Sequence, residues 1–515
     1  MSQPDFFGRR YSRRGFLTRS ALVGGGLALG GVLAGCGGEP PGASGAAAEV
    51  PTGPDAFKGV TVRVAVGSFM STGVKMFADQ WQKDTGGRLE VVEIPFGDLY
   101  SKLFQAFSSR VDAYDVLVYA GGWVSGFAKS GFISPLEDYY GKYKKNAASV
   151  LPKVEKLAYF DDKRYTVPLD GDVIMLYYRK DAFENPTAKQ RFKAEKGKDL
   201  AVPQTWADYV ECAKFFTGWD WAGNGKPCYG VLEAMKPKDV GPYIFTAHAA
   251  GYAAHPDAPG TLFFDPETMT PSVDNPGWVQ ALDDWQALKA AGPSQMVTYG
   301  GGDQRGNFVA GNYALAIDWP DIGVLAQDAS QSIVKDKLGY AIIPGSTRVY
   351  NAAGKSWDEG TEVRRAPYLG WGGWHASVAA TSKNQAAAWH FANYVDSDEA
   401  ALAAVTTPGT ARGPYRTDHF SASAWTSSAV KFARPEEYLK AQQDSFAHPN
   451  VQFDLRIPEA GRYVEALDTA IQLALAGQRS SQDALTQCAK DWSSITDQIG
   501  KESQQELYRK LQVDS

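Results

Sequence analysis

The sequence is poor in the residues on which many metal-dependent and nucleophilic enzymes rely. Its 515 residues include only four cysteines and six histidines. The histidines are scattered, and none lies in the paired spacing typical of a zinc site. The chain also has no G-x-S-x-G elbow and no phosphate-binding P-loop. We therefore predict no catalytic residue, no metal and no cofactor.

The few cysteines also limit the role of disulfide bonds. Beyond the first 36 residues only Cys212, Cys228 and Cys488 remain. Three is an odd number, so at least one thiol is free or pairs between chains. An exported protein could form a bond between Cys212 and Cys228 without needing one. The alternative is that these thiols are buried as small apolar side chains.

Positive charge is scarce outside the N-terminal segment. The whole chain has a net charge of −6, while residues 1–35 hold five arginines and one aspartate, so the remainder carries −10. A nucleic-acid-binding protein needs a basic face, so nucleic acid is excluded as a partner. Beyond this segment no run of 18 apolar residues occurs, and we predict no membrane span.

The N-terminal segment has the features of an export signal. An apolar run of 14 residues, Ala21–Ala34, follows four arginines. It is shorter than the roughly 20 residues that a bilayer span needs. Ser12–Leu17 resembles a twin-arginine (Tat) signal, and Leu33–Cys36 resembles a bacterial lipobox. This resemblance implies cleavage before Cys36 and lipid attachment to its thiol, although a plain secretory signal remains the alternative.

The remaining chain is long enough for two lobes. Residues 37–54 are rich in Gly, Pro and Ala and predict a flexible tether. About 460 residues follow residue 55. That length exceeds the size at which one hydrophobic core stops growing.

Hydrophobic periodicity predicts alternating strands and helices in the first part of the chain. The strands are expected at 60–66, 89–94 and 114–119, and the helices at 74–85 and 99–108. This order is typical of a parallel sheet covered on both faces, in which ligands bind beyond the carboxyl ends of the strands. Ser68 and Trp123 follow two of those ends, so both are candidate ligand-binding residues.

The later part of the chain has a similar pattern. Strands are expected at 173–178 and 313–318. Helices are expected from Trp206, with Thr205 as its cap, at 278–290, at 384–395 and over much of 457–511. The predicted fold class is therefore α/β for the whole chain beyond the tether.

Several short stretches resemble the extracellular solute-binding proteins of ABC importers, in the sugar-binding group that includes maltose-binding protein. The resemblance depends on their order along residues 58–500. The stretches are Phe77–Gly86, Tyr114–Val118, Gly131–Leu136, Val167–Val173, Pro203–Tyr209, Phe308–Leu315, Gly372–Trp374 and Ser382–Trp389.

The resemblance implies a two-lobe, hinged fold of the Venus-flytrap type, each lobe a sheet flanked by helices, with the solute in the cleft between them. It places residues 56–168 and 367–435 in an N-terminal lobe and residues 169–366 and 436–515 in a C-terminal lobe. It further implies that a monomer captures a sugar or oligosaccharide and hands it to the transmembrane subunits of an ABC permease. Anchored through Cys36, the chain would lie on the outer face of the cytoplasmic membrane.

Aromatic rings are plentiful, with 14 tryptophans in the chain. Flat C–H faces of sugars pack on such rings, which lose little conformational entropy. Trp123, Trp319 and Trp374 follow strand ends or glycines, and Trp371 and Trp374 flank Gly372 and Gly373. We assign Trp123, Trp319, Gly373 and Trp374 to the ligand site, although any one tryptophan could instead be core. Helix-face tryptophans at 81, 206 and 389 are predicted to be core.

Polar candidates are carboxylates and one arginine. Asp170 and Asp172 lie two residues apart, which places both on one face of a strand. They would accept hydrogen bonds from solute hydroxyls, or else form a solvated turn around Gly171. Asp318 ends an apolar strand and is assigned to the site. In the loop 409–416 either Arg412 or Arg416 is expected near the cleft, and Arg416 is assigned.

Tyr243 is assigned to the site as well, and Tyr463 is a weaker candidate. Three other functions stay open from the sequence. A secreted glycoside hydrolase or lyase would also use tryptophans and paired carboxylates. A receptor for a polyol, a phosphorylated polyol or a peptide would share the fold, with arginines binding a phosphate. A surface adhesin would need no hinged cleft.

Overall fold

The computed structural model describes residues 49–143 and 147–513, and all of them belong to one compact unit. The predicted signal segment, Cys36 and most of the tether lie outside the described residues. Among the helices that are described, none is both long enough and apolar enough to cross a bilayer.

The first sheet has five strands in the order β2-β1-β3-β14-β6. The strands are β1 (Thr61–Gly67), β2 (Arg88–Ile94), β3 (Val116–Ala120), β6 (Val167–Pro168) and β14 (Trp374–Val378). The predicted parallel pairing holds for β2, β1 and β3. The sheet also contains two strands that this prediction did not cover, and β14 runs antiparallel to both β3 and β6. Strand β14 returns from far along the chain, and sequence periodicity carries no information on its direction.

The second sheet has four strands in the order β10-β7-β9-β8. They are β7 (Met175–Arg179), β8 (Tyr229–Val231), β9 (Tyr313–Asp318) and β10 (Leu338–Ile342). Strand β7 is antiparallel to both neighbours, and β8 is parallel to β9. Every residue of β9 is buried, so this strand lies at the centre of a core.

The remaining strands form three two-stranded sheets. They are β4 (Tyr159–Phe160) with β5 (Lys163–Arg164), β11 (Ser346–Asn351) with β12 (Ser356–Arg364), and β13 (Tyr368–Leu369) with β15 (Gln452–Phe453).

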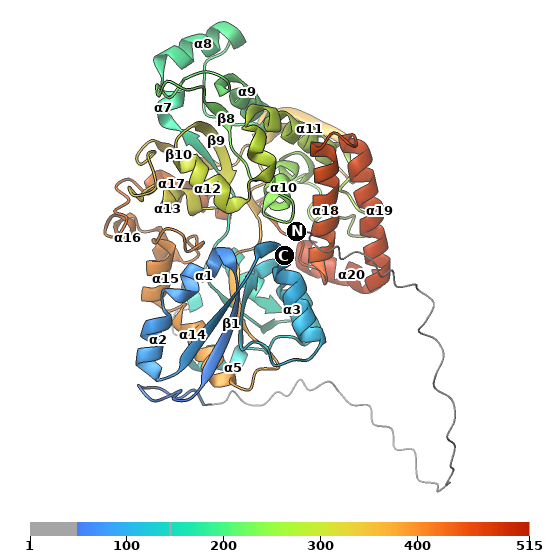
Figure 1. The fold of residues 1–515 in the computed structure, drawn as a ribbon. Helices are drawn as coiled ribbons and strands as arrows, with labels where there is room; N and C mark the ends of the chain where they lie inside the picture. The colour runs from blue at the N-terminus through green and yellow to red at the C-terminus, as the bar shows by residue number, and fades with distance from the viewer. Residues whose placement is uncertain (1–48, 144–146, 514–515) are drawn as a thin grey trace, which may run out of the picture. The chain divides into compact units, whose positions relative to one another are not determined.

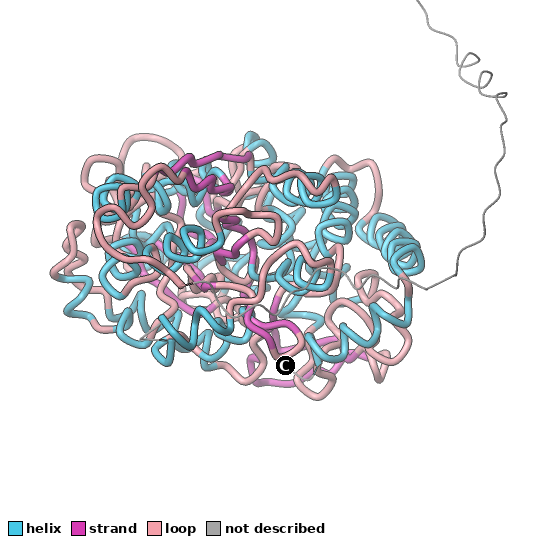
Figure 2. The backbone as a smooth tube through the Cα atoms, turned by 90° about the horizontal axis from the view of Figure 1, so that it is seen from below, coloured by secondary structure: helices cyan, strands magenta, loops and turns pink. Residues whose placement is uncertain are grey.

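Helices surround both sheets (Figures 1 and 2). Those before β7 are α1 (Ser71–Lys75), α2 (Ala78–Thr85), α3 (Leu99–Ser108), α4 (Val124–Lys129), α5 (Glu137–Tyr143) and α6 (Pro152–Glu155). After β14 follow α14 (Gln385–Tyr394), α15 (Asp398–Val405) and α16 (Ala422–Thr426). Helix α14 packs against β14 and β3 of the first sheet.

The second sheet carries a larger set of helices. Between β7 and β10 lie α7 (Lys180–Phe183), α8 (Pro186–Lys196), α9 (Trp206–Phe216), α10 (Gly241–Ala253), α11 (Pro276–Ala291), α12 (Gly301–Val309) and α13 (Asp321–Leu325). The C-terminal helices are α17 (Glu436–Ala447), α18 (Ala460–Leu475), α19 (Ser481–Ile499) and α20 (Lys501–Tyr508). Helix α17 packs on β10, while α18 and α19 lie side by side and contact α11 (Figure 1).

Local chemistry explains where the helices begin and end. The Thr205 hydroxyl accepts a hydrogen bond from the Asp208 amide at 3.1 Å and caps α9, as predicted. The single helix predicted at 74–85 is instead two helices. The Phe77 amide donates to the Val74 carbonyl, three residues back, at 3.4 Å, and this tighter turn separates α1 from α2.

The three thiols in the described residues are free and buried. Cys212 lies on the inner face of α9, and burial raises the pKa of its thiol to about 12. The alternative of buried apolar cysteines is therefore confirmed, and no bond joins Cys212 to Cys228.

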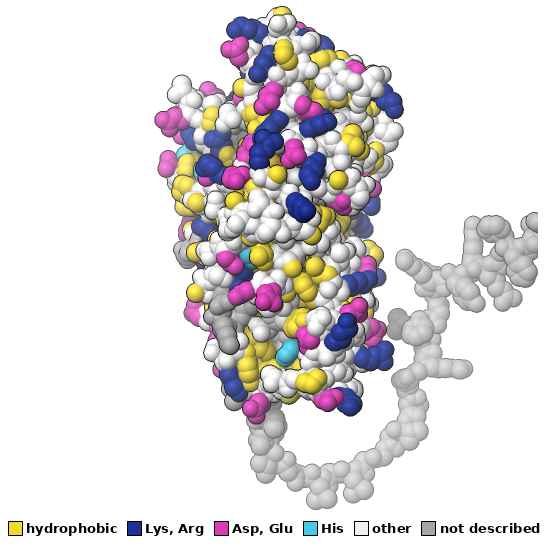
Figure 3. Space-filling view, turned by 90° about the vertical axis from the view of Figure 1, so that its left-hand side faces the viewer, with side chains coloured by type: hydrophobic (Ala, Val, Ile, Leu, Met, Phe, Trp, Pro, Cys, Tyr) yellow, Lys and Arg dark blue, Asp and Glu magenta, His cyan; other side chains and the backbone are white. Residues whose placement is uncertain are grey.

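Charges of both signs are interspersed on the surface shown in Figure 3. Lysines and arginines on that face lie among aspartates and glutamates, so no extended field of one sign covers it.

Candidate functional site

A cavity with a volume of about 20 Å³ lies where loops of the first sheet meet elements of the second. That volume has room for about one water molecule and is far below the roughly 300–1,000 Å³ common for small-molecule sites, so a ligand would need the surrounding elements to move apart. Aromatic and charged side chains predominate in its lining. The lining residues are Phe69, Phe96, Asp172, Val240, Arg305, Trp319, Asp321, Trp371, Trp374 and Ala411.

Arg305 on α12 binds two carboxylates at the cavity wall. Its Nε lies 2.8 Å from Asp318 Oδ2, and its Nη1 lies 3.0 Å from Asp321 Oδ1. Burial works to lower the pKa of Arg305, but the charges of Asp318 and Asp321 outweigh it and raise that pKa. Burial also raises the pKa of Asp318 to about 6, against the opposing effect of Arg305. Asp318 therefore acts on the cavity by fixing Arg305.

Asp170 and Asp172 lie in the connection between β6 and β7. Asp170 is fully buried; its carboxylate accepts hydrogen bonds from the amides of Gly413 and Trp374. Asp172 lines the cavity and is 6% exposed. Burial raises the pKa of Asp170 to about 6. Burial and the neighbouring Asp170 raise the pKa of Asp172 well above its usual value.

Trp319 and Trp374 both reach the cavity, as predicted from their positions after a strand end and after two glycines. The Trp319 indole is held by a hydrogen bond from its Nε1 to the Gly370 carbonyl at 2.9 Å. Gly373 has a φ of 76°, and a Cβ there would lie 2.5 Å from the Asp170 carbonyl oxygen. Glycine at 373 thus lets the chain pass close to Asp170 and position Trp374.

Trp371 forms the centre of an aromatic cluster at the cavity. Its ring centroid lies 4.4 Å from that of Phe96 and 5.4 Å from that of Trp374. The residue has a φ of 72°, which non-glycine residues rarely adopt and which is found preferentially at functional sites. Its Nε1 has no hydrogen-bond partner among the described residues.

Two predicted ligand residues support this cluster from behind. The ring of Trp123 meets the Trp371 ring edge to face at 4.7 Å, and the Tyr243 ring does so at 5.4 Å. Neither residue lines the cavity itself. Tyr243 and Tyr463 instead line a separate small cavity beside α18.

Ser68 lies at a neighbouring opening. That opening shares Phe69 and Phe96 with the cavity and continues past Lys238 and Asp239. Ser68 therefore lies outside the lining of the cavity but at one entrance to it.

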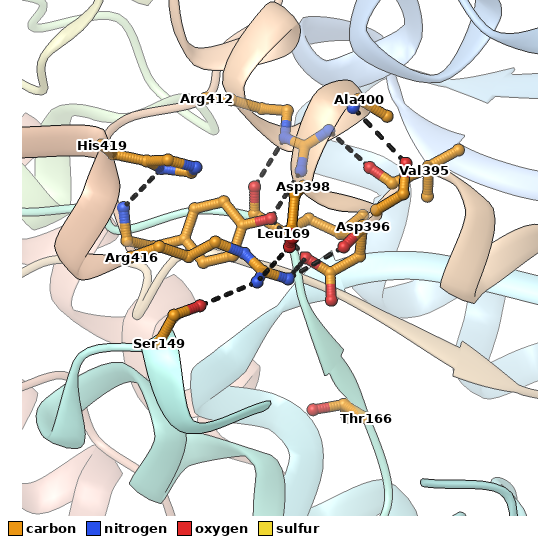
Figure 4. Close-up of polar contacts among 12 residues, drawn as sticks. Ser149, Thr166, Leu169, Val395, Asp396, Asp398, Ala400, Arg412, Arg416 and His419 are labelled. Carbon is orange, nitrogen blue, oxygen red and sulfur yellow. Dashed lines mark hydrogen bonds and ion pairs between the residues drawn. The ribbon is translucent and has the colours of Figure 1, made fainter. Parts of the chain in front are cut away.

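Arg412 and Arg416 are both buried away from the cavity lining (Figure 4). The Arg412 guanidinium donates to the carbonyls of Leu169 and Val395 and to the Tyr415 hydroxyl. The Arg416 Nη2 lies 2.7 Å from Asp396 Oδ1, and both side chains are fully buried. The structure does not bring Arg416 to the cavity, and from this loop only Ala411 lines it.

The two sheets approach each other beside the cavity at Gly97 and Lys238. Gly97 belongs to the turn that follows β2, and Lys238 precedes α10. A Cβ at Gly97 would lie 2.4 Å from the Lys238 carbonyl oxygen. Lys238 is held in place, because its amide donates to the buried Asp468 carboxylate at 2.7 Å.

Sequence reasoning thus found part of the cavity. Asp172, Trp319 and Trp374 line it, and Asp170, Asp318 and Gly373 support those residues directly. It missed Phe96, Arg305, Asp321 and Trp371 as lining residues. Trp371 and Asp321 are close in sequence to the predicted residues Trp374 and Trp319, and this proximity could have been used to predict that they line the cavity. Arg305 lies on a polar helix face, and nothing in the sequence around it indicated a place at the cavity.

The buried carboxyl groups near the cavity are expected to reduce the stability of the unliganded protein as the pH rises from 5 to 7, while buried His375 and His419, whose pKa values burial lowers to about 3, act in the opposite direction. Asp170, Asp172 and Asp318 have raised pKa values, so the folded chain holds protons that the unfolded chain has already released. Where the folded state binds more protons, the free energy of unfolding decreases with pH, here by about 1–3 kcal/mol. Urea denaturation at pH 5, 6 and 7 measures the slope.

Asp172→Asn should make the slope of stability against pH less negative than in the wild type, because it removes one carboxyl group with a raised pKa. Asp328→Asn is the matched control. Asp328 is a surface residue whose pKa is lowered by hydrogen bonds from Ser330 and Gln331, so it titrates below this window. An equal slope in wild type and Asp172→Asn would show that the pair does not titrate as described.

The chain is similar to known transport proteins over most of its length. The family model described as bacterial extracellular solute-binding protein matches residues 76–434. The mannitol-binding protein of Pseudomonas aeruginosa is 25% identical over 394 residues, which are 75% of this chain and 81% of that protein.

Solved structures share the fold. A solute-binding protein of an ABC transporter from Agrobacterium radiobacter, in complex with ribitol, has a TM-score of 0.69 at 20% identity and covers 85% of this chain and 99% of its own. The maltose-bound MalE3 of T. maritima has a TM-score of 0.65 at 20% identity and covers 85% of this chain and 100% of its own. The expected two-lobe α/β fold is therefore confirmed, and this chain belongs to the bacterial extracellular solute-binding proteins.

Proposed function

We propose that this chain is the receptor of an ABC importer and that it binds one sugar or polyol molecule between its two lobes. One observation carries the proposal: the cavity between the two sheets combines aromatic faces with charged hydrogen-bonding groups. Trp319, Trp371 and Trp374 offer flat surfaces for C–H faces, and Asp172 and Asp321 would accept hydrogen bonds from hydroxyls. The free Nε1 of Trp371 would donate to a hydroxyl oxygen.

The similar proteins support this class of solute. The relative from Pseudomonas aeruginosa is named for mannitol, and the two solved structures hold ribitol and maltose. A linear polyol is thus a second candidate for the cargo.

The lobes are proposed to comprise residues 56–168 with 367–435 and residues 169–366 with 436–515. Rotation about the connections between them would open the cavity, and a solute touching both lobes would favour the closed arrangement. The contact between Gly97 and Lys238 would then form only on closure. Closure is the signal that the permease subunits would recognise.

No catalysis is proposed. Asp170 and Asp172 are separated only by Gly171, and Asp170 is fully buried with its carboxylate bound to backbone amides. Two carboxyl groups that flank a glycosidic bond need about 5–9.5 Å between them and access to the substrate. A glycoside hydrolase is therefore the weaker candidate.

Export and anchoring complete the proposal. The arginine-rich start would direct the chain through the Tat route, and Cys36 would carry the lipid that holds a monomeric receptor at the membrane surface. The tether would give the folded part freedom to reach the permease.

The protein from Gly37 onward is expected to gain thermal stability with one class of neutral sugar or polyol. A ligand at a hundred times its dissociation constant adds about 2.7 kcal/mol to the free energy of unfolding. The panel includes sugars, polyols, sugar phosphates and short peptides. Stabilisation by phosphates or peptides alone would contradict the sugar assignment, and glycoside turnover by the purified protein would contradict the receptor role. The double variant Trp319→Ala/Trp371→Ala should abolish the shift.

A further inference from the structure

The cavity has more negative than positive charge in its walls. Asp172 and Asp321 line it, and Asp318 lies directly behind Arg305. Arg305 is the only cation among the lining residues that the structure describes. Arg305 already forms ion pairs with Asp318 and Asp321.

Asp172 is the lining carboxylate that forms no ion pair. It is 6% exposed, and its side-chain hydrogen bond is with another carboxyl group, that of Asp170. The charge of Arg305 favours the ionised form of Asp172, but the guanidinium itself is bound to Asp318 and Asp321. The nearby Arg412 does not pair with Asp172, because its guanidinium donates to the carbonyls of Leu169 and Val395 and to the Tyr415 hydroxyl. A buried carboxyl group in this position must hold a proton or meet a cation.

The aromatic residues of the cavity suit a cation as well as a sugar face. Aromatic faces carry a negative quadrupole that attracts ammonium groups. Arg305 already lies over the rings of Phe69 and Trp319, at 5.8 and 6.0 Å from their centroids. The rings of Phe96, Trp371 and Trp374 form a second group, with no cation among the described residues over them.

We propose that the preferred solute carries one protonated amine among its hydroxyls, as an amino sugar or amino polyol does, and that its ammonium group binds at Asp172 beside Phe96, Trp371 and Trp374. The inference rests on the proposed receptor function and narrows its substrate class. The ammonium group would replace the shared proton of the Asp170–Asp172 pair. The same excess of carboxylates would repel sugar phosphates and uronic acids, which carry negative charge.

Isothermal titration calorimetry on matched pairs tests the proposal. The pairs are glucose with glucosamine, galactose with galactosamine, mannose with mannosamine, and sorbitol with glucamine, all at pH 7 with glucose 6-phosphate and glucuronate as anionic probes. We expect the amine of the best-fitting pair to bind at least about tenfold more tightly than its neutral partner, which is about 1.4 kcal/mol. The anionic probes should not bind.

Asp172→Asn should weaken binding of the amine more than that of its neutral partner, so that the ratio of the two affinities falls from at least about tenfold to about one. Asp284→Asn is the control, because Asp284 is a half-buried carboxyl group that accepts hydrogen bonds from Tyr252 and Gln280 and does not line this cavity. If a neutral sugar binds and no amine binds better, the proposal is wrong although the receptor function stands. If Asp172→Asn keeps the preference, Asp172 is not the ammonium site. If no member of any pair binds, the proposed function itself fails.

Discussion

Replacing Gly97 with alanine is expected to weaken solute binding at least about tenfold, or about 1.4 kcal/mol, with little effect on folding. The new Cβ would lie 2.4 Å from the Lys238 carbonyl oxygen, which is backbone and cannot rotate away. Lys238 is further fixed by Asp468 on α18. The variant would stop short of the closed arrangement, in which a solute touches both lobes. Calorimetry with the solute from the stability panel measures the loss.

Gly302→Ala is the matched control for Gly97→Ala. Gly302 lies at the same boundary between the two sheets, and a Cβ there would be 3.8 Å from the Phe69 ring, an ordinary contact distance. Its affinity should stay close to that of wild type. Gly97→Val should bind more weakly still, because its side chain is bulkier. Unchanged affinity in both Gly97 variants would mean that the Gly97–Lys238 contact is not part of closure.

Replacing Arg416 with methionine should lower the free energy of unfolding by about 3–5 kcal/mol, because the buried Asp396 carboxylate loses the positive charge of its ion pair and keeps neutral hydrogen bonds such as that from the Tyr415 hydroxyl. Arg416 Nη1 lies 2.9 Å from the Ser149 hydroxyl, and Nη2 lies 2.8 Å from the Asp396 carbonyl oxygen and 2.7 Å from its carboxylate (Figure 4). The guanidinium therefore joins the start of α15 to the segment before α6. Urea denaturation measures the change.

The double variant Arg416→Met/Asp396→Asn is the control, and it should recover more than half of the lost stability because the uncompensated charge is gone. Folded Arg416→Met should retain its affinity for the solute, since Arg416 does not line the cavity. A loss of affinity with unchanged stability would support the ligand-binding role that the sequence predicted for Arg416.

Residue patterns were sufficient to locate most of the elements. Strands β1 and β9 lie at the predicted places. Burial of one face of a strand produces alternating apolar residues, as in β1, and burial of both faces produces a continuous apolar run, as in β9. Pairing was only partly predictable. The direction of β14 depends on contacts between residues more than two hundred positions apart, which local patterns do not encode.

The site shows the same division. Trp319 and Trp374 were predictable because each follows a strand end or a pair of glycines, and such positions lie at the edge of a sheet where ligands bind. Arg305 and Phe96 were not, since an arginine on a helix and a phenylalanine in a turn have many ordinary roles. Their place at the cavity follows from the packing of α12 and the turn after β2 around it.

The sequence by itself determined the class of protein: its α/β pattern, its excess of acidic residues and its recurrent motifs all depend on local composition and order. Only the tertiary structure decided which charges meet. Asp318, Asp321 and Arg305 form one bound group, Arg416 pairs with Asp396 away from the cavity, and Asp172 lines the cavity without forming an ion pair. The physical reason is that electrostatic pairing depends on distance and burial, and both are set when segments distant in sequence pack together.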